Sequence, residues 1–202
     1  MSQPPTHRRV NDLMKVVGFD PSLSNWGIAV GTLDVQTKAV TITFLDVIKT
    51  APTKEKSVRK NSTDLDRAEL LVKGALGVLK GAQAVFVEVP VGSQTARAMT
   101  SYGVCVGILA AFRAAGKPFF IISPDEVKKV TGGKSTASKA DMIKWAMDKH
   151  PEANWPMQSR LGVIKVVAGE AEHMADAVAC IHAGVNSQQF KQLLALLNPT
   201  NN

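Results

Sequence analysis

The chain has 202 residues, 45% of them hydrophobic, which is enough for one domain with a substantial core. Its 24 Lys and Arg outnumber its 17 Asp and Glu, and the net charge of +7 favours a polyanionic partner without identifying one. Neither a transmembrane-length apolar run nor a secretory signal is recognisable, so the sequence predicts no membrane partner and a cytoplasmic location. Cys105 and Cys180 lack metal-ligand spacing, and we expect both to be core residues in a reducing compartment.

The N-terminal part predicts a short arm followed by three strands. Residues 1–13 are polar, with prolines and arginines, and are expected to form a flexible arm. An apolar run then ends at Asp20, and a Pro- and Ser-containing turn separates it from a second apolar run that begins at Trp26. Alternation of apolar residues with threonine over 40–48 predicts a third strand. Asp20 is either a site residue at the end of a buried strand or an aspartate that caps the turn.

A helix and a parallel strand are expected next. The polar segment 54–60 is rich in lysine and arginine, which fits either ordinary solvated surface or phosphate contacts. Ser62 or Thr63 would cap a helix that ends at Gly81. The continuous apolar run 84–89 has the pattern of a strand covered on both faces, and it too carries one acid, Glu88, near its end.

The remaining chain alternates helices with one more strand. Gly103 and Gly107, one turn apart in a long apolar helix, would let that helix pack closely against a neighbour. Residues 117–122 predict a buried strand, residues 150–167 look irregular, and the C-terminal residues 187–202 predict a helix and tail. Helix-start signals stand at Ser123–Glu126 and Ser138–Asp141, and a last core helix begins near Glu170.

Three elements each offer a carboxylate. Asp20 and Glu88 end strands, and the last helix presents Asp176 with His173 on the same face, three residues earlier. Hard divalent cations such as Mg²⁺ prefer carboxylates together with phosphate oxygens. A pair of such ions can hold the attacking water and the leaving oxygen of a phosphodiester in line. Three strands in series followed by alternating helices and strands also predict an α/β fold with a mixed sheet flanked by helices.

Four segments, in this order, resemble the RuvC-type Holliday junction resolvases of the RNase H-like superfamily: FDPSLSNWGIAV, FVEVP, GVCVGILAAF with ISPDEVKKV, and EHMADAVA. The resemblance covers about residues 15–185, and its divergence favours a phage or mobile-element source. It implies an RNase H-like nuclease domain over 14–186, with an antiparallel three-strand meander joined to parallel strands.

The resemblance also implies a site and an activity. Asp20, Glu88 and Asp176 would be metal ligands, and His173 would be a fourth ligand or a proton-transfer group. Glu172 points about 100° away from His173 on a helix and is ranked below it. The implied protein is a homodimeric endonuclease, dependent on two Mg²⁺ ions that Mn²⁺ can replace. It would nick four-way DNA junctions in pairs, leaving 5′-phosphate and 3′-hydroxyl ends.

One departure concerns the segment after the second acid. Family members often carry an aromatic residue there that stacks on a junction base, whereas this chain reads Val89-Pro90-Val91-Gly92. How the branch point is opened is therefore an open question. Candidate phosphate-binding residues are Arg97, Lys128, Lys129, Lys134 and Lys139.

Three other functions are weighed against the junction nuclease. The same fold and metals could act on an RNA–DNA hybrid or another branched DNA, or the chain could bind junctions without cutting them. The GGKS segment at Gly132–Ser135 suggests a nucleotide-binding loop, but Lys128 stands where that loop requires glycine, so this function is not favoured.

Overall fold

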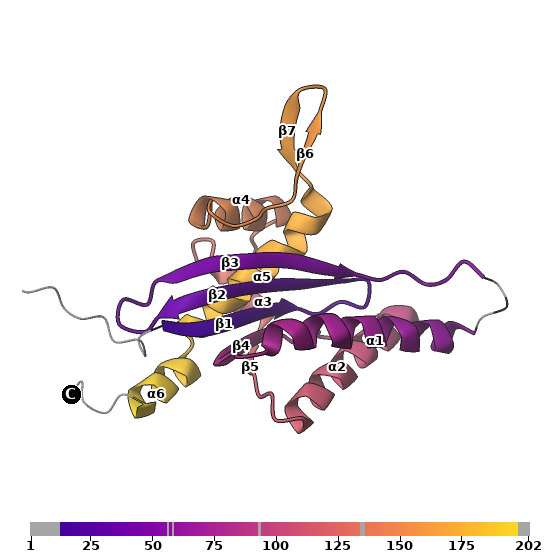
Figure 1. Cartoon of the computed structure of the whole chain (residues 1–202), viewed down its shortest axis with the longest axis horizontal. Coiled ribbons are helices and arrows are strands. Elements are labelled where there is room, and N and C mark those ends of the chain that lie inside the picture. The colour runs from indigo at the N-terminus through magenta and orange to yellow at the C-terminus, as the bar shows by residue number, and fades with distance from the viewer. Residues whose placement is uncertain (1–12, 56, 58, 93, 134–135, 198–202) are drawn as a thin grey trace, which may run out of the picture.

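A five-stranded mixed sheet forms the centre of the computed structural model (Figure 1), which describes residues 13–55, 57, 59–92, 94–133 and 136–197. The strands lie in the order β3-β2-β1-β4-β5, and a separate two-stranded sheet is formed by β6 and β7. The strands are β1 (Leu13–Asp20), β2 (Asn25–Asp34), β3 (Val40–Lys49), β4 (Ala84–Glu88), β5 (Phe120–Ile122), β6 (Met157–Arg160) and β7 (Val163–Val166).

The central sheet confirms the predicted mixed topology. β1, β2 and β3 form an antiparallel meander, whereas β4 and β5 run parallel to β1. β1 and β4 are covered on both faces, and this explains their nearly continuous apolar sequences. Asp20 and Glu88 are the last residues of these adjacent parallel strands, so the strand order brings both to one edge of the sheet.

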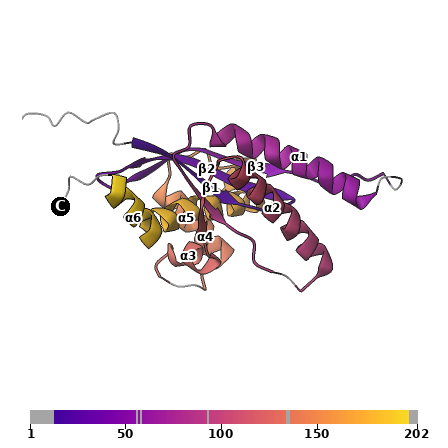
Figure 2. The same ribbon diagram turned by 90° about the horizontal axis from the view of Figure 1, so that it is seen from below.

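Helices cover both faces of the sheet (Figure 2). One apolar core joins the sheet to α1 and α2, and the other joins it to α3, α4, α5 and α6. The helices are α1 (Lys60–Leu79), α2 (Ala96–Ala114), α3 (Pro124–Lys129), α4 (Lys139–Lys149), α5 (Ala168–Asn186) and α6 (Gln188–Leu197). Phe190 of α6 contacts the rings of Phe86 and Phe120, so the C-terminal helix shares a core with the sheet.

Helix α5 lies unusually close to the sheet. A Cβ added to Gly18 of β1 would lie 2.0 Å from the carbonyl oxygen of Ala177, and one added to Gly184 would lie 2.0 Å from the ring of Phe86. Neither contact is possible for any residue other than glycine without movement of the helix. These glycines therefore bring the backbone of α5 against β1 and β4, the strands that carry the two acids.

Most predicted boundaries hold to within one or two residues, and three differences are clear in this part of the chain. Helix α1 starts at Lys60, earlier than Ser62 or Thr63, and its N-cap residue makes no side-chain cap. The strand predicted over 117–122 is reduced to β5, because the chain before it turns at Gly116, which has φ +73°. Leu13, assigned to the arm, begins β1, while residues 1–12 lie outside the described part of the chain.

The segment 150–167 is the largest difference. It was expected to be irregular but contains the β6–β7 hairpin, whose strands have four residues each and are too short for a clear periodic signal. The predicted close packing through Gly103 and Gly107 is also absent, since no atom lies within 4 Å of a Cβ built on either residue. Both glycines are on the exposed side of α2 in the isolated chain.

Other expectations about composition agree with the structure. Cys105 and Cys180 are free thiols, and both are fully buried in the two cores. Ser138 forms the predicted capping box with Asp141, and the helix-start signal at Ser123 is also a capping box, with Glu126. In the described part of the chain, no helix has the length and apolar character needed to cross a membrane.

Candidate active site

Four of the predicted site residues come from three elements that meet at one edge of the sheet. Asp20 ends β1, Glu88 ends the adjacent strand β4, and His173 and Asp176 belong to the first half of α5. The side chains of all four are partly buried. Residues separated by about 150 positions therefore share one half-buried polar site.

Asp20 and His173 are in direct contact. The Nδ1 atom of His173 lies 2.7 Å from Oδ2 of Asp20, and the two side chains are 20% and 19% exposed. With a carboxylate as partner, Nδ1 is the donor, which leaves Nε2 to bind a metal or to exchange a proton. The hydrogen bond to Asp20 raises the pKa of His173 above its ordinary value. The sequence predicted these two residues for one site but not this bond.

The other two carboxylates hold protons unusually tightly. Burial, followed by the charge of Asp20, raises the pKa of Glu88 to about 7, and the charge of Lys128 acts in the opposite direction. Burial also raises the pKa of Asp176 to about 8, with Asp20, Glu88 and Glu172 adding to the effect and His173 opposing it. Mutual repulsion among poorly solvated carboxylates is the electrostatic condition that a cation relieves.

The donor set fits a hard cation, but it is not fully assembled. Among the described residues, no three His, Cys, Asp or Glu side chains lie close enough together to hold one metal ion. Carboxylates are nevertheless the ligands that Mg²⁺ and Mn²⁺ prefer, and the charge of Asp20 contributes to the raised pKa values of both Glu88 and Asp176. Binding of an ion would therefore require side-chain movement rather than a new arrangement of the fold.

A cavity of about 290 Å³ opens beside the carboxylates. Its wall contains Glu88 and Asp176, together with the basic residues Lys128 and Lys139 and the acid Glu172. Lys139 is 77% exposed and forms an ion pair of 2.5 Å with Glu172. Glu172, ranked below His173 from the sequence, thus lines the cavity and orients a lysine. Two of the five predicted phosphate-binding residues lie in this wall.

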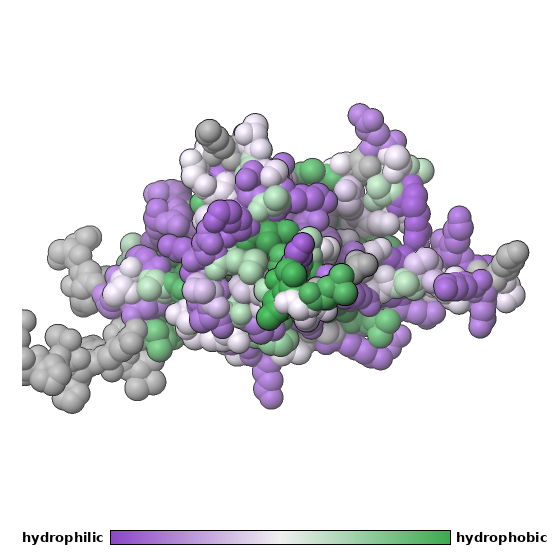
Figure 3. Space-filling view, turned by 90° about the horizontal axis from the view of Figure 1, so that it is seen from above, coloured by the Kyte–Doolittle hydropathy of each residue, from purple (hydrophilic) through white to green (hydrophobic). Residues whose placement is uncertain are grey.

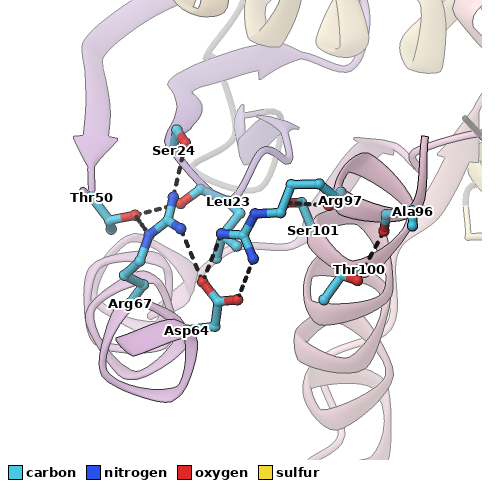
Figure 4. Close-up of polar contacts among 9 residues, drawn as sticks. All are labelled: Leu23, Ser24, Thr50, Asp64, Arg67, Ala96, Arg97, Thr100 and Ser101. Carbon is cyan, nitrogen blue, oxygen red and sulfur yellow. Dashed lines mark hydrogen bonds and ion pairs between the residues drawn. The ribbon is translucent and has the colours of Figure 1, made fainter. Parts of the chain in front are cut away.

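The other three predicted phosphate-binding residues either do not line this cavity or fall outside the described residues. Lys129 is exposed on α3, beyond the wall of the cavity, and Lys134 falls outside the described residues. Arg97 is 52% exposed and binds Asp64 of α1 with both of its terminal nitrogens, at 2.7 and 3.0 Å. This bidentate pair joins the start of α2 to α1 (Figure 4), and Arg97 does not line the cavity beside Glu88 and Asp176.

Asp64 is the centre of a polar cluster that the sequence did not reveal (Figure 4). Besides Arg97, it accepts a hydrogen bond of 3.0 Å from Arg67, which is only 3% exposed. Arg67 also donates to Thr50 at the end of β3 and to Ser24 in the β1–β2 turn. The cluster ties α1 and α2 to the turn that follows Asp20. An opposite-charge pair at i, i+3 on the helix was its one visible signal.

Comparison with known proteins identifies the fold. No protein-family model matches the sequence, and a search of curated proteins finds no match. Among solved structures, Thermus thermophilus RuvC in complex with a Holliday junction substrate matches with a TM-score of 0.58 and 21% identity, over 84% of this chain and 92% of that chain. Another Thermus thermophilus RuvC structure matches with a TM-score of 0.57 and 20% identity, over 93% of this chain and 98% of that chain. The resemblance predicted from the sequence motifs is confirmed in three dimensions, and the chain has the RNase H-like fold of RuvC.

Proposed function

We propose that this protein is a metal-dependent, structure-selective endonuclease that resolves four-way DNA junctions. The observation that carries the proposal is the meeting of Asp20, Glu88, Asp176 and His173 at one edge of a RuvC-like sheet. The similar protein from Thermus thermophilus was solved in complex with a Holliday junction substrate. The net charge of +7 is consistent with a nucleic-acid partner.

The carboxylates would hold Mg²⁺ or Mn²⁺, which supplies Lewis-acid activation of a water and of the scissile phosphate. The protein's own groups act around this centre. Nε2 of His173, oriented by the bond from Nδ1 to Asp20, is available to bind the ion or to move a proton at the reacting oxygens. Lys128 and Lys139, on the wall beside Glu88, would bind the phosphates that flank the cut and orient the strand.

The second half of the proposal is a homodimer, since paired nicks require two sites. The exposed side of α2 supports it. This surface contains Gly103 and Gly107, whose Cβ positions are open. Met99 and Val106 on the same side are 48% and 43% exposed. A second α2 could approach closely here, which would also explain two glycines whose Cβ positions no described residue approaches within 4 Å.

The test is cleavage of a synthetic four-way junction with Mg²⁺, with Mn²⁺ and with a chelator. An equal-length duplex and an RNA–DNA hybrid serve as comparison substrates, and Asp20→Asn serves as the inactive control. Symmetric metal-dependent nicks in the junction, absent with Asp20→Asn, would establish the function. Preferential cutting of the hybrid would assign the same site to another substrate. A junction that is bound but uncut with either metal would leave only a binding role.

A further inference from the structure

The β6–β7 hairpin has no evident structural role in the isolated fold. It projects away from the central sheet as a two-stranded ribbon (Figure 1), and every described side chain from 157 to 165 is exposed. Two-stranded hairpins without a packed face are only marginally stable in water. The hairpin also leads directly into α5, the helix that carries His173 and Asp176. Its position suggests a role at the proposed active site.

The hairpin exposes an unusual amount of apolar surface. Seen from the side of the molecule from which the hairpin projects, hydrophobic surface gathers near the centre of the face (Figure 3). Exposed apolar residues of this size mark an interaction surface when they occur together. The exposed apolar residues of the hairpin are Met157 at 50%, Leu161 at 97%, Val163 at 51% and Ile164 at 67%.

The tip of the hairpin breaks the usual rule for such turns. Leu161 and Gly162 are its two central residues, and both have positive φ, 51° and 76°. A two-residue hairpin turn of this kind strongly favours Asn-Gly or Asp-Gly, because a branched side chain is strained at positive φ. Leucine at this position therefore destabilises the turn relative to asparagine or aspartate. Local sequence choices that oppose the local structure are expected at functional positions.

The two faces of the hairpin differ in character. The pairing register places Met157 and Ile164 on one face, while Gln158, Val163 and Lys165 lie on the other. Leu161, together with the residues of this second face, forms a shallow concave surface. The segment 157–166 contains two basic residues and no acidic residue. An apolar tip above a stem that carries apolar and basic residues but no acidic one matches the chemistry of DNA, whose stacked bases lie inside a polyanionic backbone.

The hairpin is long enough to contact DNA that is bound at the proposed active site. Strands of four residues extend about 13 Å, Val167 adds about 3 Å, and the five residues of α5 before His173 add about 8 Å, so the chain from the hairpin turn to His173 spans at most about 24 Å. At about 3.4 Å per base step, this distance corresponds to about seven base pairs. A tip at this distance could touch the branch point of a junction whose strand is held at the carboxylates.

We propose that the β6–β7 hairpin is a wedge for branched DNA, in which Leu161 inserts between bases at the branch point and Lys165 contacts the backbone. This inference rests on the proposed junction nuclease function. It would supply a contact with the bases in place of the aromatic residue that the segment Val89-Pro90-Val91-Gly92 lacks. Proteins that insert leucine and similar side chains between base steps unstack them and kink the duplex.

The variant that tests the wedge is Leu161→Asn, because asparagine accepts positive φ and keeps the turn intact. Leu196→Asn is the matched control, since Leu196 is 79% exposed but lies on α6. Both are compared with the unaltered hairpin in an Asp20→Asn background, on a junction that carries 2-aminopurine at the branch point. We expect the unaltered hairpin to raise the fluorescence as bases unstack, and Leu161→Asn to lose most of that rise. Junction affinity should fall about 3- to 10-fold, with duplex affinity unchanged.

A rescue experiment separates a wedge from a merely structural hairpin. With Asp20 intact, cleavage by Leu161→Asn should be slow on a fully paired junction and recover on a junction with two unpaired bases at its centre. Fluorescence and cleavage equal to those of Leu196→Asn would overturn the wedge, as would failure of the pre-opened junction to restore cleavage. In both cases an active wild-type protein would leave the nuclease function standing. A wild-type protein that neither binds nor cuts the junction would overturn both proposals.

Discussion

Gly27 of β2 and His173 of α5 meet backbone against backbone: a Cβ built on Gly27 would lie 2.1 Å from the carbonyl oxygen of His173. Gly27 is also the residue paired with Asp20 across the β1–β2 ladder. The same close contact therefore sets the height of α5 above the sheet and the 2.7 Å hydrogen bond between His173 and Asp20.

Gly27→Ala should push α5 away from the sheet, because backbone atoms cannot give way to the added methyl group. We expect a loss of about 1–3 kcal/mol in the free energy of unfolding and a marked loss of cleavage from the displacement of His173. Urea unfolding and junction cleavage measure the two effects.

The matched control for Gly27→Ala is Gly77→Ala, at an exposed position of α1 where no described atom lies within 4 Å of the new Cβ. Alanine there should raise the stability of the monomer by up to about 1 kcal/mol. Equal effects of the two substitutions on stability would contradict the role assigned to Gly27.

Asp20→Asn, Glu88→Gln and Asp176→Asn should each abolish cleavage and leave junction binding intact or stronger. Each change removes a metal-binding oxygen and also removes negative charge near the DNA phosphates. The loss of rate should exceed about 100-fold, since even the outer partners of metal ligands are worth 10- to 100-fold. Asp66→Asn, on the exposed surface of α1, is the control. Wild-type rates in any of the three site variants would remove that residue from the proposed site.

Asp176 should make the metal-free protein less stable as the pH rises. Its pKa is about 8 in the folded chain and 3.8 without the fold, so between these values the folded state holds a proton that the unfolded state has lost. Stability therefore falls from pH 4 to pH 8. In chelator, Asp176→Asn should be more stable than wild type by several kcal/mol at pH 8 and little different at pH 4, since each unit of pKa difference is worth about 1.4 kcal/mol. Thermal unfolding across pH tests this, and a constant difference would contradict it.

His182 should make the protein more stable as the pH rises, the opposite of the effect of Asp176. Its Nε2 atom lies 2.7 Å from Nε2 of the buried His150, and burial lowers the pKa of His182 from 6.5 to about 4. As the pH falls from 6.5 to about 4, His182 becomes protonated in the unfolded chain but stays neutral in the folded chain, so the free energy of unfolding decreases. His182→Gln should reduce the loss between pH 7 and pH 4 by about 2 kcal/mol. Denaturant unfolding at both pH values gives the comparison, and an unchanged pH dependence would disprove it.

Asp64→Asn should be strongly destabilising, because it removes the carboxylate from two arginines, one of them buried. The guanidinium of Arg97 beside Asp64 holds the pKa of that carboxyl below its usual value. Loss of one partner from a buried ion pair costs about 3–5 kcal/mol. The control is Asp148→Asn, which breaks an exposed pair with Lys144 and should cost less than about 1 kcal/mol. Similar unfolding free energies for the two variants would contradict the structural role of the Asp64 cluster.

The sequence by itself was sufficient for the mixed sheet, the order of its elements and the four candidate site residues. Local patterns carry this information: apolar runs that end at Asp20 and Glu88, helical spacing around His173 and Asp176, and the capping boxes at Ser123 and Ser138. Parallel strands whose carboxyl ends meet at one edge then bring the acids together without any knowledge of side-chain geometry.

Only the tertiary structure decided how close these groups come and what surrounds them. The contact of Gly27 with His173 and the ion pair of Arg97 with Asp64 join residues far apart in the sequence, so no local pattern predicts them. The β6–β7 hairpin was missed for a different reason: its strands are short, and its turn is Leu161-Gly162 rather than Asn-Gly. Apolar periodicity and turn-forming residues predict only those elements whose sequences follow the usual preferences. This hairpin does not follow them, so only the three-dimensional structure reveals it.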